Sequence, residues 1–259
     1  MKENIRKMAP FLKFLVLLGS LATFIYTFYV VGNLTLFLSL PREISKAHTW
    51  IFNLLDNKSR LETAYGPIVW DALYIIGFIF QHSLQKSAIV KNLLRKWGLA
   101  SAERTMYCLT SSLCLHYLLK NWLPATSIVL WQINVESPVI WWAFVITHIL
   151  CWAVIFGGSI ILDLPELLGI KQAYYSLHNY ADPLAYKSPQ LRTLYAHVRH
   201  PSFIGFTLIL FVTNVMSLDR LVLAVLLTTY MYVAWSTDQR DVAYHQQQLQ
   251  RKKHELKAQ

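Results

Sequence analysis

Two long apolar stretches constrain the fold of this 259-residue chain more than any other feature. Residues 11–31 and 139–162 each contain the roughly 20 residues that a helix needs to cross a bilayer. Four shorter apolar runs have a similar character, at 64–80, 105–122, 202–218 and 221–236. Only 15% of the residues are charged, against about 25% in soluble domains. We therefore expect residues 1–259 to form a single multi-pass membrane domain. Its expected fold class is all-α, a polytopic transmembrane bundle of about six spans with short interfacial helices.

The last two apolar runs are separated only by Asp219 and Arg220. Because backbone groups in lipid must be hydrogen-bonded internally, this spacing predicts a tight helical hairpin in which Arg220 reaches for the interface. The first run is interpreted as a retained span rather than a cleaved signal peptide, because no small-x-small cleavage site follows it.

The distribution of basic residues predicts the orientation. With six spans, 18 of the 24 Lys and Arg residues fall on the side of the two termini and six on the other side. Basic residues accumulate on the cytosolic side of membrane proteins, so both termini are expected in the cytosol or the nucleoplasm. The net charge of +10 is therefore interpreted as a sign of membrane topology. We expect the lipid bilayer as the main partner and no specific recognition of nucleic acid.

Three segments are expected outside the spans. Residues 84–97 alternate apolar and basic residues at helical spacing, which predicts an amphipathic helix in the inner interface. Pro165 is expected to end or restart a helix just beyond the fourth span. Residues 238–259 form a polar, basic tail that is expected to be an exposed helix.

A few polar residues and three cysteines lie within the apolar spans. Asp71 is expected either to pair with another span or to lie at the interface. His116 and His148 are expected to pack inside the bundle with hydrogen-bond partners. Three cysteines lie in apolar runs at spacings that fit neither a zinc site nor a disulfide, so buried thiols and no metal are expected. They are Cys108, Cys114 and Cys151.

Polar residues gather at the span ends on the expected inner side. They are Gln81, His82, Ser83, Glu103, Arg104, Tyr107, Asp163, Glu166, Arg199, His200, Asp238 and Asp241. The positive-inside bias explains the arginines but neither the acids nor the two histidines, and no comparable set is expected on the opposite side. A cluster assembled from separate helix ends predicts a functional site. The alternative, that these charges simply flank the spans, stays open.

Arg199-His200-Pro201 is the most specific sequence pattern in this set. Proline suits the first turn of a helix, and it pushes the preceding His200 out of helical geometry. His200 would then lie beside a helix N-terminus, which attracts anions. Arg199 adds a cation suited to carboxylate recognition.

The stretch from Arg199 to Gly205 resembles the RHPxYxG motif of the isoprenylcysteine carboxyl methyltransferase superfamily, multi-span enzymes that use S-adenosylmethionine. Gln81-His82-Ser83 and the group Glu103, Arg104 and Tyr107 are similar to motifs of the methanethiol S-methyltransferases. A longer match, over about 64–253 and including the blocks 167–175 and 183–189, resembles the nurim family of six-span inner nuclear membrane proteins.

These resemblances imply a location and a site. They imply a multi-pass protein of the nuclear inner membrane, with nucleoplasmic or cytosolic termini and nuclear-envelope proteins as partners. The implied cofactor is S-adenosylmethionine, and the implied substrate is a small thiol or carboxylate at the inner face. The implied cofactor-binding residues are Arg199, His200, Gly205 and Asp238. The implied catalytic residues are His82, Arg104 and His200.

Departures from the enzyme pattern leave two interpretations open. Phe203 replaces the motif tyrosine, and Asp238-Gln239 stands where the enzymes carry a Glu-Glu pair. Loss of one charged member of a buried network typically costs about 3–5 kcal/mol, so the cofactor pocket is expected to be weakened. The chain is then either a methyltransferase-like scaffold with no assured activity and no assured cofactor, or a working S-adenosylmethionine-dependent enzyme. A transporter is disfavoured because no inverted repeat is evident.

Overall fold

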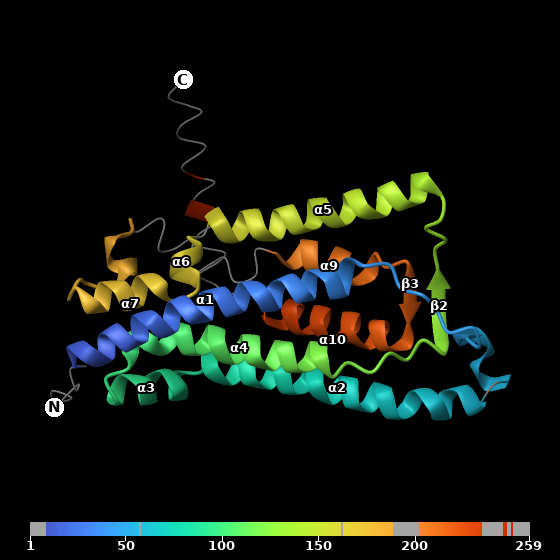
Figure 1. Cartoon of the computed structure of the whole chain (residues 1–259), viewed down its shortest axis with the longest axis horizontal. Helices are drawn as coiled ribbons and strands as arrows, with labels where there is room; N and C mark the ends of the chain where they lie inside the picture. Colours follow the sequence, from blue (N-terminus) through green and yellow to red (C-terminus); the bar gives the residue numbers. More distant parts are fainter. Residues whose placement is uncertain are drawn as a thin grey trace, which may run out of the picture.

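Long helices lie side by side in an elongated bundle (Figure 1). The computed structural model describes residues 9–56, 58–161, 163–188 and 202–234, together with 246, 247 and 250. The bundle helices are α1 (Pro10–Ser39), α2 (Lys58–Lys86), α4 (Glu103–Lys120), α5 (Pro138–Ile161), α9 (Phe203–Phe211) and α10 (Leu218–Ala234). We call the end where α2 leads into α4 the inner end, and the opposite end the outer end.

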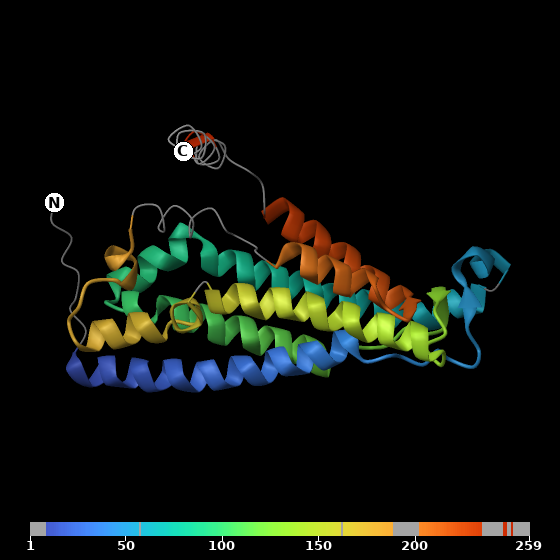
Figure 2. The same cartoon turned by 90° about the horizontal axis from the view of Figure 1, so that it is seen from above.

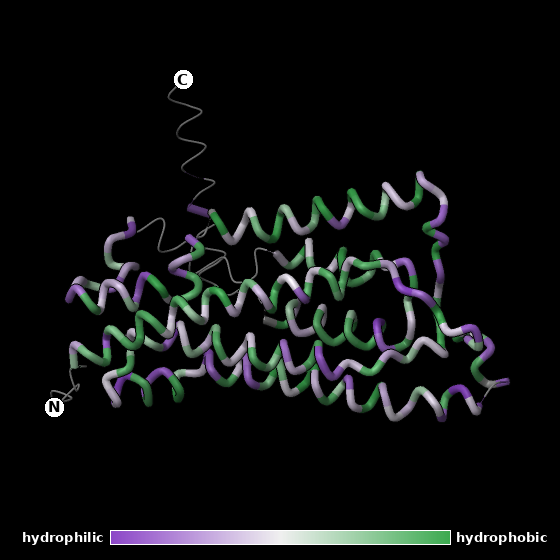
Figure 3. Tube along the Cα trace, viewed as in Figure 1, coloured by the Kyte–Doolittle hydropathy of each residue, from purple (hydrophilic) through white to green (hydrophobic). Residues whose placement is uncertain are grey.

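The expected all-α membrane bundle is confirmed. Within the described residues, three helices are long and apolar enough to cross a membrane, Pro10–Ser39, Lys58–Lys86 and Pro138–Ile160. Large apolar side chains along α5 face outward, including Ile149, Leu150 and Val154, and apolar residues dominate the long helices in Figure 3. An outward apolar surface on a long helix is what a lipid environment requires.

The number of crossings stays a prediction. Helix α9 has nine described residues, which span about 13 Å at 1.5 Å per residue, against a hydrocarbon core of about 30 Å. Residues 189–201, which precede it, lie outside the described residues. Helix α10 has 17 residues.

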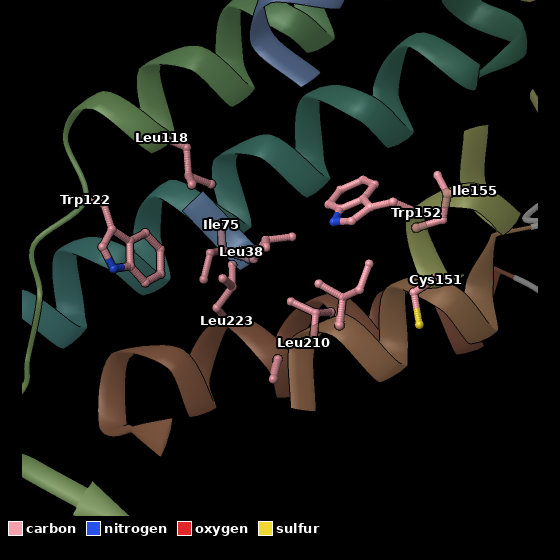
Figure 4. Close-up of a cluster of buried hydrophobic side chains, with 11 residues drawn as sticks. Leu38, Ile75, Leu118, Trp122, Cys151, Trp152, Ile155, Leu210 and Leu223 are labelled. Atoms are coloured by element: carbon pink, nitrogen blue, oxygen red, sulfur yellow. The ribbon is translucent and has the colours of Figure 1, made fainter. Parts of the chain in front are cut away.

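A large apolar cluster links the bundle helices near the middle of the bundle (Figure 4). Leu38 from α1 and Ile75 from α2 meet Trp152 from α5 and Leu223 from α10, and Leu118 from α4 and Leu210 from α9 also belong to the cluster. Contacts from six helices fix the relative positions of the helix ends, and therefore of the polar residues that follow them.

A small sheet closes the outer end, which the sequence did not predict. Its strands are β1 (Thr49–Trp50), β2 (Ile128–Gln132) and β3 (Val215–Ser217). β1 pairs parallel with β2, and β2 pairs antiparallel with β3. The three strands come from three connections that are far apart in sequence, so the sheet ties these connections together.

This sheet corrects the expected tight hairpin between the last two runs. Residues 212–217 do not continue a helix, and β3 occupies part of them. The backbone N–H and C=O groups of β3 form hydrogen bonds with β2. A continuous helix is therefore not needed to satisfy them. Arg220 also does not reach for the interface. It is buried, its Nη2 donates to the Phe37 carbonyl at 2.6 Å, and its guanidinium lies 3.8 Å from the Phe37 ring centre.

The short inner helices follow the sequence pattern. Helix α3 (Ala88–Lys96) falls within the predicted amphipathic segment, and the side chain of Ser87 caps its N-terminus. Helix α6 (Leu164–Leu167) restarts with Pro165 in its first turn, as predicted. Helix α7 (Ile170–Leu177) follows and lies alongside α1 (Figure 2). The described part of the chain also contains the 3-10 helices η1 (Ile51–Asp56), η2 (Ala100–Ala102) and η3 (Pro183–Tyr186).

Candidate functional site

His82 and Tyr107 meet at the inner end of the bundle. His82 comes from the last turns of α2 and Tyr107 from the second turn of α4, and the Tyr107 hydroxyl lies 2.5 Å from Nε2 of His82. The Ser111 hydroxyl lies 3.3 Å from Nδ1 of the same ring. Tyr230 of α10 approaches the ring edge at 6.1 Å between ring centres. This group joins three helices and contains one titratable imidazole.

Arg104 binds the protein backbone in this structure. Its Nε donates to the Leu167 carbonyl at 2.9 Å, and its guanidinium lies 5.6 Å from the Tyr107 ring centre. Gly169 brings the α6–α7 turn this close, since a Cβ at this position would lie 2.7 Å from the Thr105 backbone nitrogen. The positive φ of 91° at Gly169 also favours glycine. Arg104 therefore holds the α6–α7 turn against the start of α4.

The acids that follow α5 are paired with lysines. Glu166 is buried and lies 2.9 Å from the Lys187 ammonium. Asp163 pairs with Lys171 and lies 3.9 Å from Lys187. These ion pairs fix the turn around α6. They explain the two acids by local structure and require no ligand.

Gly205 packs directly against α5. A Cβ at this position would lie 3.1 Å from Cγ1 of Ile155 and 3.2 Å from the Cys151 carbonyl oxygen. The absence of a side chain therefore lets α9 approach α5 closely. Close packing of α9 against α5 therefore explains why the stretch from Arg199 to Gly205 ends in glycine.

Two predicted site residues, His82 and Arg104, both lie close to Tyr107 at the inner end. Gly205 packs against α5 instead, and Arg199, His200, Asp238 and Asp241 lie outside the described residues. The structure therefore brings together part of the predicted constellation.

An open pocket of about 560 Å³ lies at the same end. Its walls include Lys13 of α1, Tyr175 of α7 and Asp182 beyond α7. His82, Arg104 and Gly205 do not line it. His82 and Arg104 instead contact Tyr107 and the Leu167 carbonyl, respectively, so they do not by themselves outline a nucleoside site.

The outer end holds a buried charged network that the sequence analysis missed. Asp219 is fully buried and accepts hydrogen bonds from Arg42 at 3.1 Å and from Trp122 at 2.9 Å. Ser217 donates to its other oxygen. The amide side chain of Asn214 pairs with the backbone of Arg42 in both directions, at 2.8 and 2.9 Å. We call this set of residues, together with Arg220, the outer network.

The carboxylate at the centre of the outer network lies between the expected spans 202–218 and 221–236. Burial by itself raises the pKa of Asp219, but Arg42 and the hydrogen bonds from Ser217 and Trp122 outweigh it. The pKa of Asp219 therefore lies below its ordinary value, and the side chain carries a charge that compensates Arg42. The one sequence signal for this network was a charged pair, Asp219-Arg220, between two apolar runs.

The isolated polar residues of the spans are paired. His148 contacts the Val212 carbonyl at 2.7 Å and Ser39 at 2.9 Å, and His116 lies 2.7 Å from the Tyr26 hydroxyl, which confirms their predicted packing role. Asp71 is fully buried within the protein. It accepts a hydrogen bond from the Leu123 backbone at 3.0 Å, in the connection after α4.

The cysteines are free, with Cys108 and Cys151 buried and Cys114 half-buried. Buried thiols are confirmed for the first two. Among the described residues, no group of three or more His, Cys, Asp or Glu residues could hold a metal ion.

Comparison with known proteins gives a consistent result. The chain is 75% identical to a Nurim homolog of Drosophila pseudoobscura pseudoobscura over 253 residues, covering 97% of this chain and all of that protein. It is 72% identical to a Nurim homolog of Drosophila melanogaster, with 97% and 100% coverage. Nurim of Homo sapiens is 33% identical over 210 residues, covering 80% of this chain and 78% of its own length. No family model matches, and no solved structure gives a significant match.

Proposed function

The chain belongs to the nurim family, and from this premise we propose that it is a multi-pass protein of the inner nuclear membrane built on a methyltransferase-like scaffold. The observation that carries the proposal is the similarity to Nurim homologs over almost the full length of both chains. In this proposal both termini face the nucleoplasm or cytosol, and residues 1–259 act as one membrane domain with a polar basic tail.

The structure supports the membrane part of this proposal in two ways. Three described helices have the length and apolar composition of spans. Asp219 of the outer network is buried and paired with Arg42 within the bundle, as a costly group in a membrane protein must be. A structural or organising role at the nuclear envelope needs only this anchored bundle and its exposed inner segments, which would contact other nuclear-envelope proteins.

Location and orientation can be tested together. Immunogold electron microscopy of the tagged chain should place label on the inner nuclear membrane, and mild detergent with salt should fail to release it from nuclei.

For orientation, Lys96→Cys marks the exposed end of α3 and Glu136→Cys marks the exposed outer loop. In intact isolated nuclei, an impermeant maleimide that passes nuclear pores should label Lys96→Cys and leave Glu136→Cys unlabelled until detergent is added. Label confined to other membranes contradicts the location, and the reverse labelling pattern contradicts the orientation.

A methyltransferase is the second candidate function. It is favoured by one observation, the contact between His82 and Tyr107 beside Arg104 at the inner end. A thiol substrate would need a base, which an imidazole supplies, whereas a carboxylate would need none. S-adenosylmethionine would supply an electrophilic methyl group at such a site. The role of the described residues would be to orient the acceptor and, for a thiol, to remove its proton.

Binding of S-adenosylhomocysteine to the purified full chain tests this candidate. The expected result is a thermal shift or a measurable heat of binding at millimolar ligand, weakened in His82→Ala and unchanged in the surface variant Lys91→Gln. Absence of binding by the well-folded wild-type chain at millimolar ligand eliminates the enzyme and leaves the structural role.

A further inference from the structure

The open pocket of about 560 Å³ lies where four segments meet at the inner end. They are the start of α1, the loop at 98–101, α7, and residues 179–183 that follow it. Helix α7 contacts both α1 and η2, and α1 and α7 lie side by side in both views (Figures 1 and 2). The volume falls within the range of about 300–1,000 Å³ typical of small-ligand sites.

The walls of this pocket have a defined shape. Gly98 and Asn179 both adopt positive φ, 76° and 58°, which turns the chain at two corners. The Tyr180 backbone nitrogen donates to the Tyr175 carbonyl at 2.8 Å, and their rings meet edge to face at 5.8 Å. The two tyrosines therefore form a fixed aromatic corner.

Lys13 brings a cation to one wall. It lies in the first turns of the apolar helix α1, and its ammonium donates to the Asn179 side chain at 2.6 Å. An ammonium group carries three donors, so this bond orients the amine and leaves donors for an anion. A phosphate is the anion expected at the headgroup level of a membrane.

Hydrogen-bond acceptors also line the pocket. Gln172 and Ser101 both line the pocket, and within the described part of the chain their side-chain oxygens are buried without a hydrogen-bond partner. Buried oxygens in this state call for a ligand or water that supplies donors. Asp182 adds a carboxylate to the lining, and aromatic faces attract cations as well.

The pocket lining thus contains a cation, acceptor oxygens and two aromatic rings. We propose that it binds the headgroup of an amine-bearing glycerophospholipid, with the phosphate on Lys13 and the primary ammonium on the side of Gln172, Asp182 and the two tyrosines. A choline headgroup satisfies the phosphate contact but has no N–H donor for these oxygens. Asp182 disfavours headgroups with several phosphates through like-charge repulsion. The proposal depends on the membrane placement of the chain and is independent of its nuclear location and of any methyl transfer.

Native mass spectrometry of the full chain released from nanodiscs tests the proposal. The nanodiscs contain equal amounts of phosphatidylethanolamine and phosphatidylcholine, and monodisperse elution shows that each variant is folded. The wild-type chain should retain phosphatidylethanolamine about tenfold over phosphatidylcholine, as expected for charge-assisted hydrogen bonds. Lys13→Gln and Asp182→Asn should each abolish most of this preference. Ala181→Trp, which fills the pocket, should abolish retention, and the exposed-lysine control Lys96→Gln should keep both.

Two results would overturn the proposal. One is equal retention of the two lipids by the wild-type chain, and the other is a preference that Lys13→Gln and Asp182→Asn leave unchanged. A parallel thermal-shift measurement with glycerophosphoethanolamine distinguishes a lipid from a soluble phosphate ester. A shift that requires Lys13, together with no retained lipid, would assign the pocket to a soluble ligand and contradict the lipid source.

Discussion

The two ends of the bundle use charged residues differently. At the outer end, Asp219 is fully buried and bound by Arg42, Trp122 and Ser217, so that three distant connections meet on one carboxylate. At the inner end, polar side chains form smaller separate groups, such as His82 with Tyr107, and an open pocket lies beside them.

The sequence pattern predicted a functional cluster at the inner end and missed the buried carboxylate at the outer end. The inner end has more polar residues, including the buried Glu166 beside Lys187, whereas at the outer end several polar groups converge on one buried carboxylate. A buried charge needs its partners to keep the bundle closed. Polar groups at a partly exposed end remain available to ligands and partners.

The largest expected effect comes from removing the centre of the outer network. Asp219→Ala leaves Arg42 without its buried partner, and the loss of a buried pair typically costs about 3–5 kcal/mol of unfolding free energy. Titration with SDS in mixed micelles measures this loss. Asp219→Asn, which keeps the side-chain volume, should also destabilise the chain because it removes the charge. A loss below about 1 kcal/mol for Asp219→Ala would contradict a closing role for the network.

A smaller effect is expected where α9 crosses α5. Gly205→Val forces side-chain atoms into Ile155 and the Cys151 carbonyl, and such overpacking costs about 1–3 kcal/mol. The matched control is Gly158→Val in α5, where a Cβ meets nothing within 4 Å. Equal stability of the two variants in the same titration would show that Gly205 is not needed for packing.

Removing one hydrogen bond at the inner end should cost less. Tyr107→Phe deletes the hydroxyl that lies 2.5 Å from His82 and is expected to lower the unfolding free energy by about 1 kcal/mol. Tyr65→Phe, at an exposed tyrosine of α2, serves as the control and should change nothing. If Tyr107→Phe costs as much as Asp219→Ala, the contrast between the two ends is wrong.

The smallest effect is expected at the partly exposed pair Lys91 and Glu103, whose charged atoms lie 3.3 Å apart. A double-mutant cycle of Lys91→Gln and Glu103→Gln should give an interaction of less than about 1 kcal/mol, because water screens the pair. The interaction should fall further at high salt. A value that salt does not change would indicate burial of this pair.

The helices could be predicted because their signals are local. The apolar run at 139–162 became α5, Ser87 caps α3, and Pro165 restarts a helix. Part of the candidate site was predicted for the same reason, since His82 and Arg104 lie at helix ends that the pattern located. The sheet could not be predicted, because Thr49 pairs with Ile128 and Val129 with Ser217 across long stretches of sequence.

The sequence by itself determined that this chain forms apolar helices. An apolar run in lipid must satisfy its own backbone hydrogen bonds, and a helix does this between residues only four positions apart. It also determined the family, through similarity along nearly the whole chain. Only the tertiary structure decided which charges are buried and where a pocket opens. Arg42, Trp122 and Asp219 meet from three separate connections, and such contacts depend on the packing of helices distant in sequence.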